Sequence, residues 1–113
     1  MKSTKKIKLG QLFQNVEINT QTGNYVPVAS DVLKLVEMNS PTPVTVTINP
    51  NVFKAEDQLL VSQYGAGEVS FVAGSGMTIL SDTNKLKISA RYTFGTLIFR
   101  SATEVYLSGA LKA

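Results

Sequence analysis

The 113-residue sequence contains no cysteine, no histidine and no tryptophan. Without cysteine, the chain can form no disulfide and offers no thiolate nucleophile or thiolate metal ligand. Without histidine, it lacks the commonest general base near neutral pH, the usual partner of a nucleophilic serine and the commonest metal ligand. We therefore predict a protein that is not an enzyme and that holds neither a cofactor nor a metal ion.

Long apolar runs are missing as well. No stretch approaches the roughly 18 to 20 residues that a membrane-spanning helix needs. The N-terminus is basic and has no apolar segment of signal-peptide length. We expect no membrane insertion, and synthesis and assembly in a cytoplasm.

Positive charge is concentrated at the N-terminus. Four of the eleven lysine and arginine residues lie within the first eight positions, and from residue 9 onward seven positive side chains accompany eight negative ones. The body is nearly neutral, which argues against nucleic acid as a partner, because nucleic-acid-binding domains carry basic residues on the fold itself. We divide the chain into an extended basic N-terminal arm, residues 1–28, and a β-domain, residues 29–113.

Short segments of alternating apolar and polar residues follow the arm. Residues 44–48 show the pattern most clearly, with Val44, Val46 and Ile48 on one face of a predicted strand. Residues 32–38 are also predicted as a strand, because seven residues are few for a helix and β-branched side chains disfavour it. Turn residues recur about every eight to twelve positions, a spacing typical of sandwiches and barrels. The sequence predicts an all-β protein, a compact antiparallel β-sandwich or barrel.

Four glycines lie within residues 63–79, QYGAGEVSFVAGSGMTI. A dinucleotide-binding or phosphate-binding loop needs its glycines to run into the N-terminus of a helix. Here Gly65 and Gly67 precede one predicted strand, and Gly74 and Gly76 precede the next. We therefore predict that these glycines form hairpin turns and let backbone segments approach closely.

Three segments resemble a small β-domain of tailed-bacteriophage virion proteins: VEMNSPTPVTVTI, QLLVSQYGAGEVSFVAGSGMTI and KLKISARYTFGTLIFRSATEVYLSGAL. This domain occurs in head-fibre and capsid-decoration proteins and at the C-termini of tail fibres. The resemblance covers residues 32–111 and is most specific over residues 63–79. The sequence departs from the family pattern at Val105, where tryptophan is usual, at Ala110, where aspartate is frequent, and at Arg91, where glutamine is usual.

The resemblance implies a non-enzymatic virion structural protein that works as a homotrimer. Because about 30 residues precede the β-domain, too few for a fibre shaft, we expect a capsid decoration or head-fibre protein. It would lie on the capsid surface after assembly in the host cytoplasm, with the major capsid protein or another virion protein as its partner. The residues expected to dock the arm on the particle are Lys5, Lys6, Lys8, Leu9, Leu12 and Phe13.

The aromatic residues of the β-domain are expected mainly to pack in the core or between subunits. Tyr64 is the exception, because it lies at a turn beside Gly65, and we treat it as a possible exposed ligand contact. A tail-fibre or tail-tip subunit that recognises cell-surface glycans is therefore an alternative function. A single-stranded nucleic-acid binder built on a barrel is a further alternative, which the neutral body disfavours. Hydrolysis by Glu56 and Asp57 is disfavoured, because adjacent carboxylates on a loop rarely face one cleft.

Overall fold

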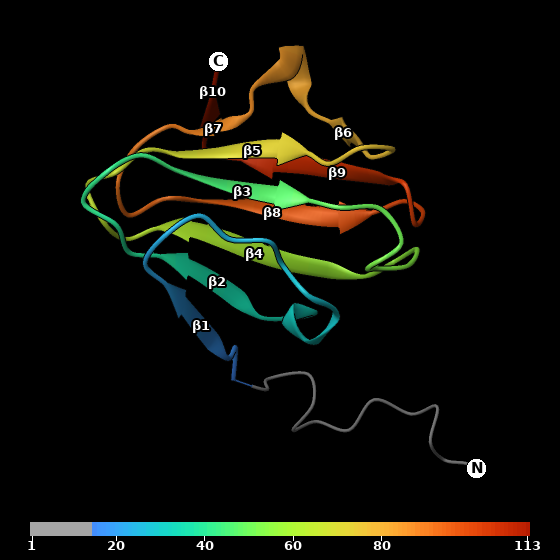
Figure 1. Ribbon diagram of the computed structural model, residues 1–113. Helices are drawn as coiled ribbons and strands as arrows, with labels where there is room; N and C mark the ends of the chain where they lie inside the picture. Colours follow the sequence, from blue (N-terminus) through green and yellow to red (C-terminus); the bar gives the residue numbers. More distant parts are fainter. Residues whose placement is uncertain (1–14) are drawn as a thin grey trace.

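The computed structural model describes residues 15–113, which form ten strands and two short 3-10 turns (Figure 1). The six-stranded sheet has the order β1 (Ile18–Gln21), β2 (Leu35–Met38), β4 (Gln58–Gln63), β8 (Phe94–Phe99), β9 (Glu104–Gly109) and β6 (Thr78–Leu80). The four-stranded sheet has the order β10 (Leu111–Lys112), β7 (Lys87–Ile88), β5 (Val69–Ala73) and β3 (Val44–Ile48). The 3-10 turns are η1 (Ala29–Asp31) and η2 (Asp82–Asn84). The predicted compact β-domain is thus confirmed.

Consecutive strands from β2 to β7 alternate between the two sheets. As a result β2 pairs with β4 in parallel, Leu35 opposite Leu60, and β3 pairs with β5 in parallel, Val44 opposite Val69. In both pairs the partner lies 25 positions further along the chain. From β2 to β5 the chain therefore winds as a flat coil, in which β3 is the crossover between parallel strands β2 and β4, and β4 is the crossover between parallel strands β3 and β5.

Both sheets are mixed, which corrects the antiparallel prediction. Parallel pairs join β1 to β2, β2 to β4, β3 to β5 and β6 to β9, and the remaining pairs are antiparallel. The prediction was wrong because short Gly-rich and Pro-rich connections are typical of hairpins. Here the same kind of connection carries the chain from one sheet to the other.

The prediction of hairpin turns at the four glycines is corrected for the same reason. The loop with Gly65 and Gly67 joins β4 to β5, and the loop with Gly74 and Gly76 joins β5 to β6, so both loops cross between sheets. Close backbone approach is confirmed, because a Cβ atom on Gly67 would overlap the Thr42 carbonyl group. Gly76 has a φ of +88°, a left-handed conformation that glycine adopts at little cost.

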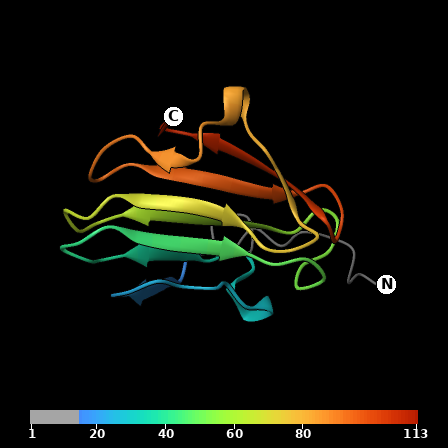
Figure 2. The same cartoon turned by 45° about the horizontal axis from the view of Figure 1, so that its top comes forward.

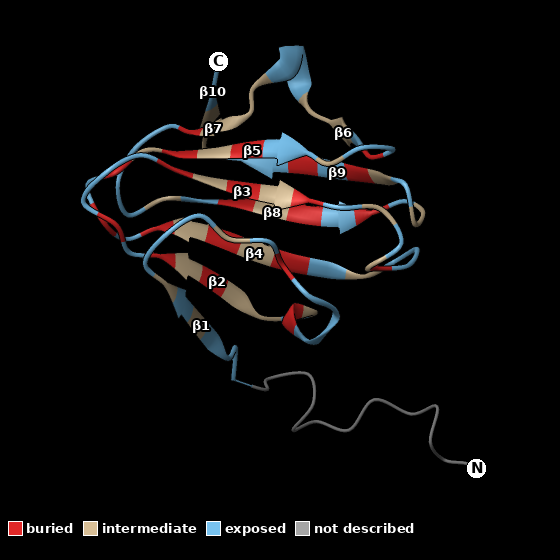
Figure 3. Ribbon diagram, viewed as in Figure 1, coloured by how far each residue is buried: buried red, intermediate tan, exposed pale blue. Residues whose placement is uncertain are grey.

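The core lies between the sheets and follows the predicted alternation. Val44, Val46 and Ile48 of β3 are buried, as expected, and their threonine neighbours are half-buried. Figure 3 shows buried positions alternating with half-buried or exposed ones along most of the strands. At one end of the core the rings of Phe53 and Phe99 stack with centroids 4.6 Å apart. Segments with alternating apolar residues thus form strands with one buried face, because successive side chains of a strand point to opposite faces.

Residues 15–28, the second half of the predicted arm, lie against the β-domain. Strand β1 pairs with β2, and Tyr25 forms a bridge beside Val46 on the outer edge of β3. The N–H of Tyr25 donates to the Thr45 carbonyl at 3.0 Å, and the N–H of Thr47 donates to the Tyr25 carbonyl at 3.0 Å. These bonds satisfy backbone groups that an open sheet edge leaves unpaired. The proposed docking residues, Lys5 to Phe13, lie outside the described residues.

The loops gather at the two ends of the strands (Figures 1 and 2). Residues 39–43, 64–68 and 89–93 share one end, on the left of Figure 1, because β2 and β4 finish there and β8 begins there. Strand β1 is parallel to β2 and β4, so it begins at the opposite end. Within residues 15–113, no helix has the length and apolar character required to cross a membrane.

Candidate functional site

The outer face of the six-stranded sheet carries rows of apolar side chains. Strand register places Ile98 of β8 beside Tyr106 of β9. A second row crosses β1, β2 and β4 at Ile18, Leu35 and Leu60. Alternation along the strands turns these side chains away from the core. We call this surface the apolar face, and its members are Ile18, Leu35, Leu60, Leu80, Phe94, Ile98 and Tyr106.

The outer face of the four-stranded sheet is polar by comparison. Its outward positions on β3 and β5 include Thr45, Thr47 and Ser70, and Lys87 of β7 lies beside Ser70. Val72 is the single large exposed apolar side chain on these strands as the structure describes them. The two outer faces therefore differ in degree: the large exposed apolar side chains gather on the six-stranded sheet, where they alternate with polar ones such as Glu37, Ser62 and Thr96.

An ion cluster completes the polar face. Glu68 contacts Lys112 at 2.9 Å and Lys87 at 3.8 Å. The hydrogen bond from Lys112 is the main cause that holds the pKa of the Glu68 carboxyl below its usual value. Because the carboxylate and both ammonium groups are solvated, the cluster keeps this face hydrophilic and contributes little to stability.

Tyr64, the predicted ligand contact, lies at the loop end of the sheet and is 49% exposed. Its ring meets that of Tyr92 edge to face, with the centroids 5.9 Å apart. Arg91 lies over the Tyr92 ring at 4.8 Å, and its Nε donates to the Tyr64 carbonyl at 2.9 Å. The sequence marks Tyr64 through its neighbouring glycine, but nothing in it indicates that the turn at residues 89–93 lies alongside. We call Tyr64, Tyr92 and Arg91 the tyrosine cluster.

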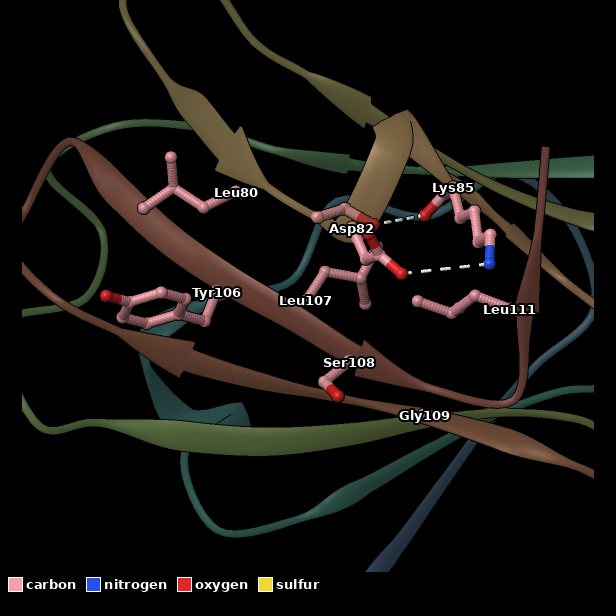
Figure 4. Close-up of a pocket in the computed structure, with 9 residues that line it drawn as sticks. Leu80, Asp82, Lys85, Tyr106, Leu107, Ser108, Gly109 and Leu111 are labelled. Carbon is pink, nitrogen blue, oxygen red and sulfur yellow. Dashed lines mark hydrogen bonds and ion pairs between the residues drawn. The ribbon is translucent and has the colours of Figure 1, made fainter.

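A shallow cavity of about 340 Å³ lies where β6, β9 and η2 meet (Figure 4). Its polar groups include Ser108 and the ion pair between Asp82 and Lys85, whose charged atoms are 3.8 Å apart. Lys85 also accepts a hydrogen bond from the Ser81 hydroxyl through its backbone carbonyl, at 2.6 Å. The two charges neutralise each other, so the cavity offers hydroxyl groups and apolar walls but no unpaired acid or base. The remaining lining residues are Leu80, Tyr106, Leu107, Gly109 and Leu111.

The adjacent carboxylates Glu56 and Asp57 do not share a cleft. Asp57 accepts hydrogen bonds from the backbone N–H of Lys54 at 3.0 Å and from its ammonium group at 3.1 Å. The backbone bond is the main cause that lowers the pKa of Asp57. Asp57 therefore holds the loop that leads into β4, while Glu56 is exposed with a left-handed φ of 77°. Among residues 15–113, no group of three or more acidic side chains is placed to hold a metal ion.

A buried carboxyl group connects residues 19–31. Asp31 is 1% exposed, and its Oδ1 accepts a hydrogen bond from Asn19 Nδ2 at 2.8 Å. Its Oδ2 accepts from the Tyr25 hydroxyl at 2.6 Å and from the Val28 N–H at 2.9 Å. In the sequence Asp31 precedes the predicted strand at residues 32–38, and nothing there marks it as buried. In the structure the Asp31 carboxylate holds together β1, through Asn19, and the segment beside β3, through Tyr25 and Val28.

Tyr25 gives this network a pH dependence that can be measured. Burial, followed by the hydrogen bond to Asp31, raises the pKa of the Tyr25 phenol above its usual value of 10.0. Folding therefore favours the protonated phenol, and its contribution is complete below the unfolded pKa and is lost as the pH rises through the folded pKa. We expect the stability difference between the protein and its Tyr25→Phe variant to shrink as the pH is raised from about 9 to values above the unfolded pKa of about 10. Urea unfolding across this range measures it, and a constant difference would contradict the assignment.

Comparison with protein families, with curated proteins and with solved structures finds no match to this chain. The resemblance to phage virion domains therefore stays a prediction from the sequence.

Proposed function

We propose that this protein is a non-enzymatic structural protein of a tailed-bacteriophage virion, and that it assembles into a trimer through the apolar face. The observation that carries the proposal is the contrast between the two outer faces of the sandwich. One is covered by threonine, serine and lysine side chains, and the other exposes about half of each of Ile18, Phe94, Ile98 and Tyr106. Apolar side chains that are exposed together on one face of a sheet often mark an interface, whereas scattered ones are ordinary on soluble monomers.

Self-association fits the geometry better than a small ligand does. The apolar rows spread across strands β1, β2, β4, β8, β9 and β6, so they form a broad surface on a rigid sheet rather than a deep cleft. Subunit interfaces are broad and apolar in this way, whereas small-molecule sites are concave. The polar face would then remain in water on the outside of the assembly.

The place in the virion rests on the sequence resemblance. We propose a capsid decoration or head-fibre protein that is attached through the residues from Lys5 to Phe13. A tail-fibre subunit is the alternative. In lysates of the phage that encodes the chain, we expect the protein to sediment with DNA-filled heads even when tails are absent. Recovery with tails alone would favour the alternative, and absence from all particles would contradict both.

Ile98 tests the apolar face, and Val72 provides a matched control. Both are outward apolar residues on strands and are similarly exposed, at 45% and 41%. We expect the unaltered chain to have three times its 12.2 kDa mass in solution. Ile98→Lys should dissociate it, with at least a tenfold higher dissociation constant, because each subunit would bring a charge into an apolar interface. Val72→Lys should leave the mass unchanged. Sedimentation equilibrium measures all three.

Each result bears on the proposal. A monomeric wild-type protein at about 100 µM, well above the micromolar range of weak complexes, would contradict self-association. Dissociation by Val72→Lys but not by Ile98→Lys would place the interface on the polar face instead. Circular dichroism of each variant shows whether a change in mass reflects assembly or unfolding.

A further inference from the structure

The tyrosine cluster has two properties that packing within the domain does not explain. The first is exposure, because Tyr92 is 67% exposed although it is among the largest apolar side chains of the domain. The second is backbone conformation, because Tyr92 has a left-handed φ of 69°. Such a conformation is costly for a bulky residue, and asparagine or glycine would adopt it more readily. Leu33 has both properties too, and what distinguishes Tyr92 is the tyrosine ring and the guanidinium group that lie against it.

The surrounding backbone holds the cluster in one arrangement. The N–H of Tyr92 donates to the Gln63 carbonyl at 2.7 Å, and the N–H of Gln63 donates to the Thr93 carbonyl at 3.0 Å. The Thr93 hydroxyl closes the turn by donating to the Ala90 carbonyl at 2.6 Å. Together with the bond from Arg91 to Tyr64, these contacts link the turn at residues 89–93 to the end of β4. A ligand would meet side chains that are already oriented, which lowers the entropy cost of binding.

Arg91 distinguishes the kind of ligand. The other six cations of the described chain, Lys34, Lys54, Lys85, Lys87, Arg100 and Lys112, each have a carboxylate partner. Arg91 has no such partner among residues 15–113, and its one side-chain hydrogen bond uses Nε. Its two terminal amino groups are therefore available to an anionic group, for which a guanidinium offers paired donors.

We propose that the tyrosine cluster binds an acidic saccharide. The tyrosine rings offer flat apolar surfaces for the C–H faces of a sugar, their hydroxyls offer hydrogen bonds to its edge, and Arg91 offers paired donors to its carboxylate. The tyrosine cluster lies at the end of the domain opposite the start of β1. If the residues before β1 attach the chain to a particle, as the proposed function has it, the cluster faces away from that particle. This site is separate from the apolar face and does not require self-association.

Titration of the 15N-labelled full chain with trigalacturonate and with sialyllactose tests the proposal, and galactotriose and lactose are the neutral controls. We expect the acidic sugars to shift the amide signals of residues 63–65 and 90–93, and to bind at least fivefold more tightly than the neutral ones. If neither acidic sugar shifts these amides at 10 mM, the proposal is wrong. Equal binding of acidic and neutral sugars would remove the role of Arg91.

Three variants separate recognition from folding. Tyr92→Asn keeps a residue that tolerates the left-handed backbone, and should weaken binding at least tenfold while the rest of the spectrum is preserved. Arg91→Gln should abolish the preference for acidic sugars, whereas Arg100→Gln, which removes an exposed arginine elsewhere, should retain it. Ile98→Lys should bind sugar as the unaltered chain does, so loss of self-association and loss of sugar binding are distinguishable. Unchanged affinity in Tyr92→Asn would overturn the proposal.

Discussion

Gly67→Ala should destabilise the domain by about 3 kcal/mol or more, because one added methyl group has no space beside the backbone of residues 40–42. A Cβ atom at this position would overlap the Thr42 carbonyl group and would lie 2.9 Å from the Ser40 carbonyl oxygen. The N–H of Gly67 also donates to that Ser40 oxygen at 2.8 Å, so the loop cannot move away without losing the bond. Since the obstacle is backbone, no side-chain rotation relieves it.

Gly23→Ala is the matched control. A Cβ atom on Gly23 meets nothing within 4 Å. The same methyl group should therefore change stability by less than about 1 kcal/mol, and in the stabilising direction if it restricts the unfolded chain. Urea unfolding of both variants, followed by circular dichroism, measures the contrast. Similar losses in both variants would show that the close approach of the two loops is not what requires glycine at residue 67.

Asp31→Ala should cost about 2 to 3 kcal/mol, because it removes the acceptor of three partly buried hydrogen bonds at once. The Tyr25 hydroxyl and the Val28 N–H would each lose the acceptor of a partly buried hydrogen bond, and Asn19 would keep only its bond to the Tyr25 hydroxyl. Strand β1 and the segment that covers β3 should loosen first, because the carboxyl group holds these two segments together in addition to their backbone pairing with β2 and β3. Hydrogen exchange should therefore accelerate at residues 18–28 before it does in β4 and β8.

Two further variants test the cause. Asp31→Asn keeps one acceptor oxygen but presents an amide to a donor, so its loss of stability should be intermediate. Asp82→Ala removes a carboxylate that is 82% exposed and 3.8 Å from Lys85, and should cost less than about 0.5 kcal/mol. If Asp31→Ala costs no more than Asp82→Ala, the buried network does not stabilise the domain.

The positions of the strands could be predicted from the sequence, but their partners could not. Alternation in residues 44–48 identified both the strand and its buried face, because the period of a strand is local information. Whether the next strand pairs with its neighbour or crosses to the other sheet depends on how a turn packs. The approach of Gly67 to Thr42, two residues 25 positions apart, is a contact of this kind. A hairpin and a crossing use the same turn residues, so the sequence pattern fits both.

The candidate surfaces were accessible from sequence to different degrees. Tyr64 was marked by its turn, and the structure exposes it. Its neighbours Tyr92 and Arg91 reach it from a turn about 27 residues later, through pairing of β4 with β8 that no local pattern encodes. The apolar face also escaped prediction, because residues such as Ile98 alternate with buried ones in the same strand. An apolar residue on either face fits a β pattern.

The 25-residue winding restricts how this protein can change length. From β2 to β5 each full turn of the coil supplies one strand to each sheet, so loss or gain of a single strand there would send the next segment to the opposite sheet. In that sheet its apolar side chains would no longer fit the core positions that they fill now. Variants of the domain should therefore differ by whole turns, or by insertions within loops such as residues 49–57, where neither sheet is interrupted. A library of random insertions sorted for folded protein should recover these two classes and few others.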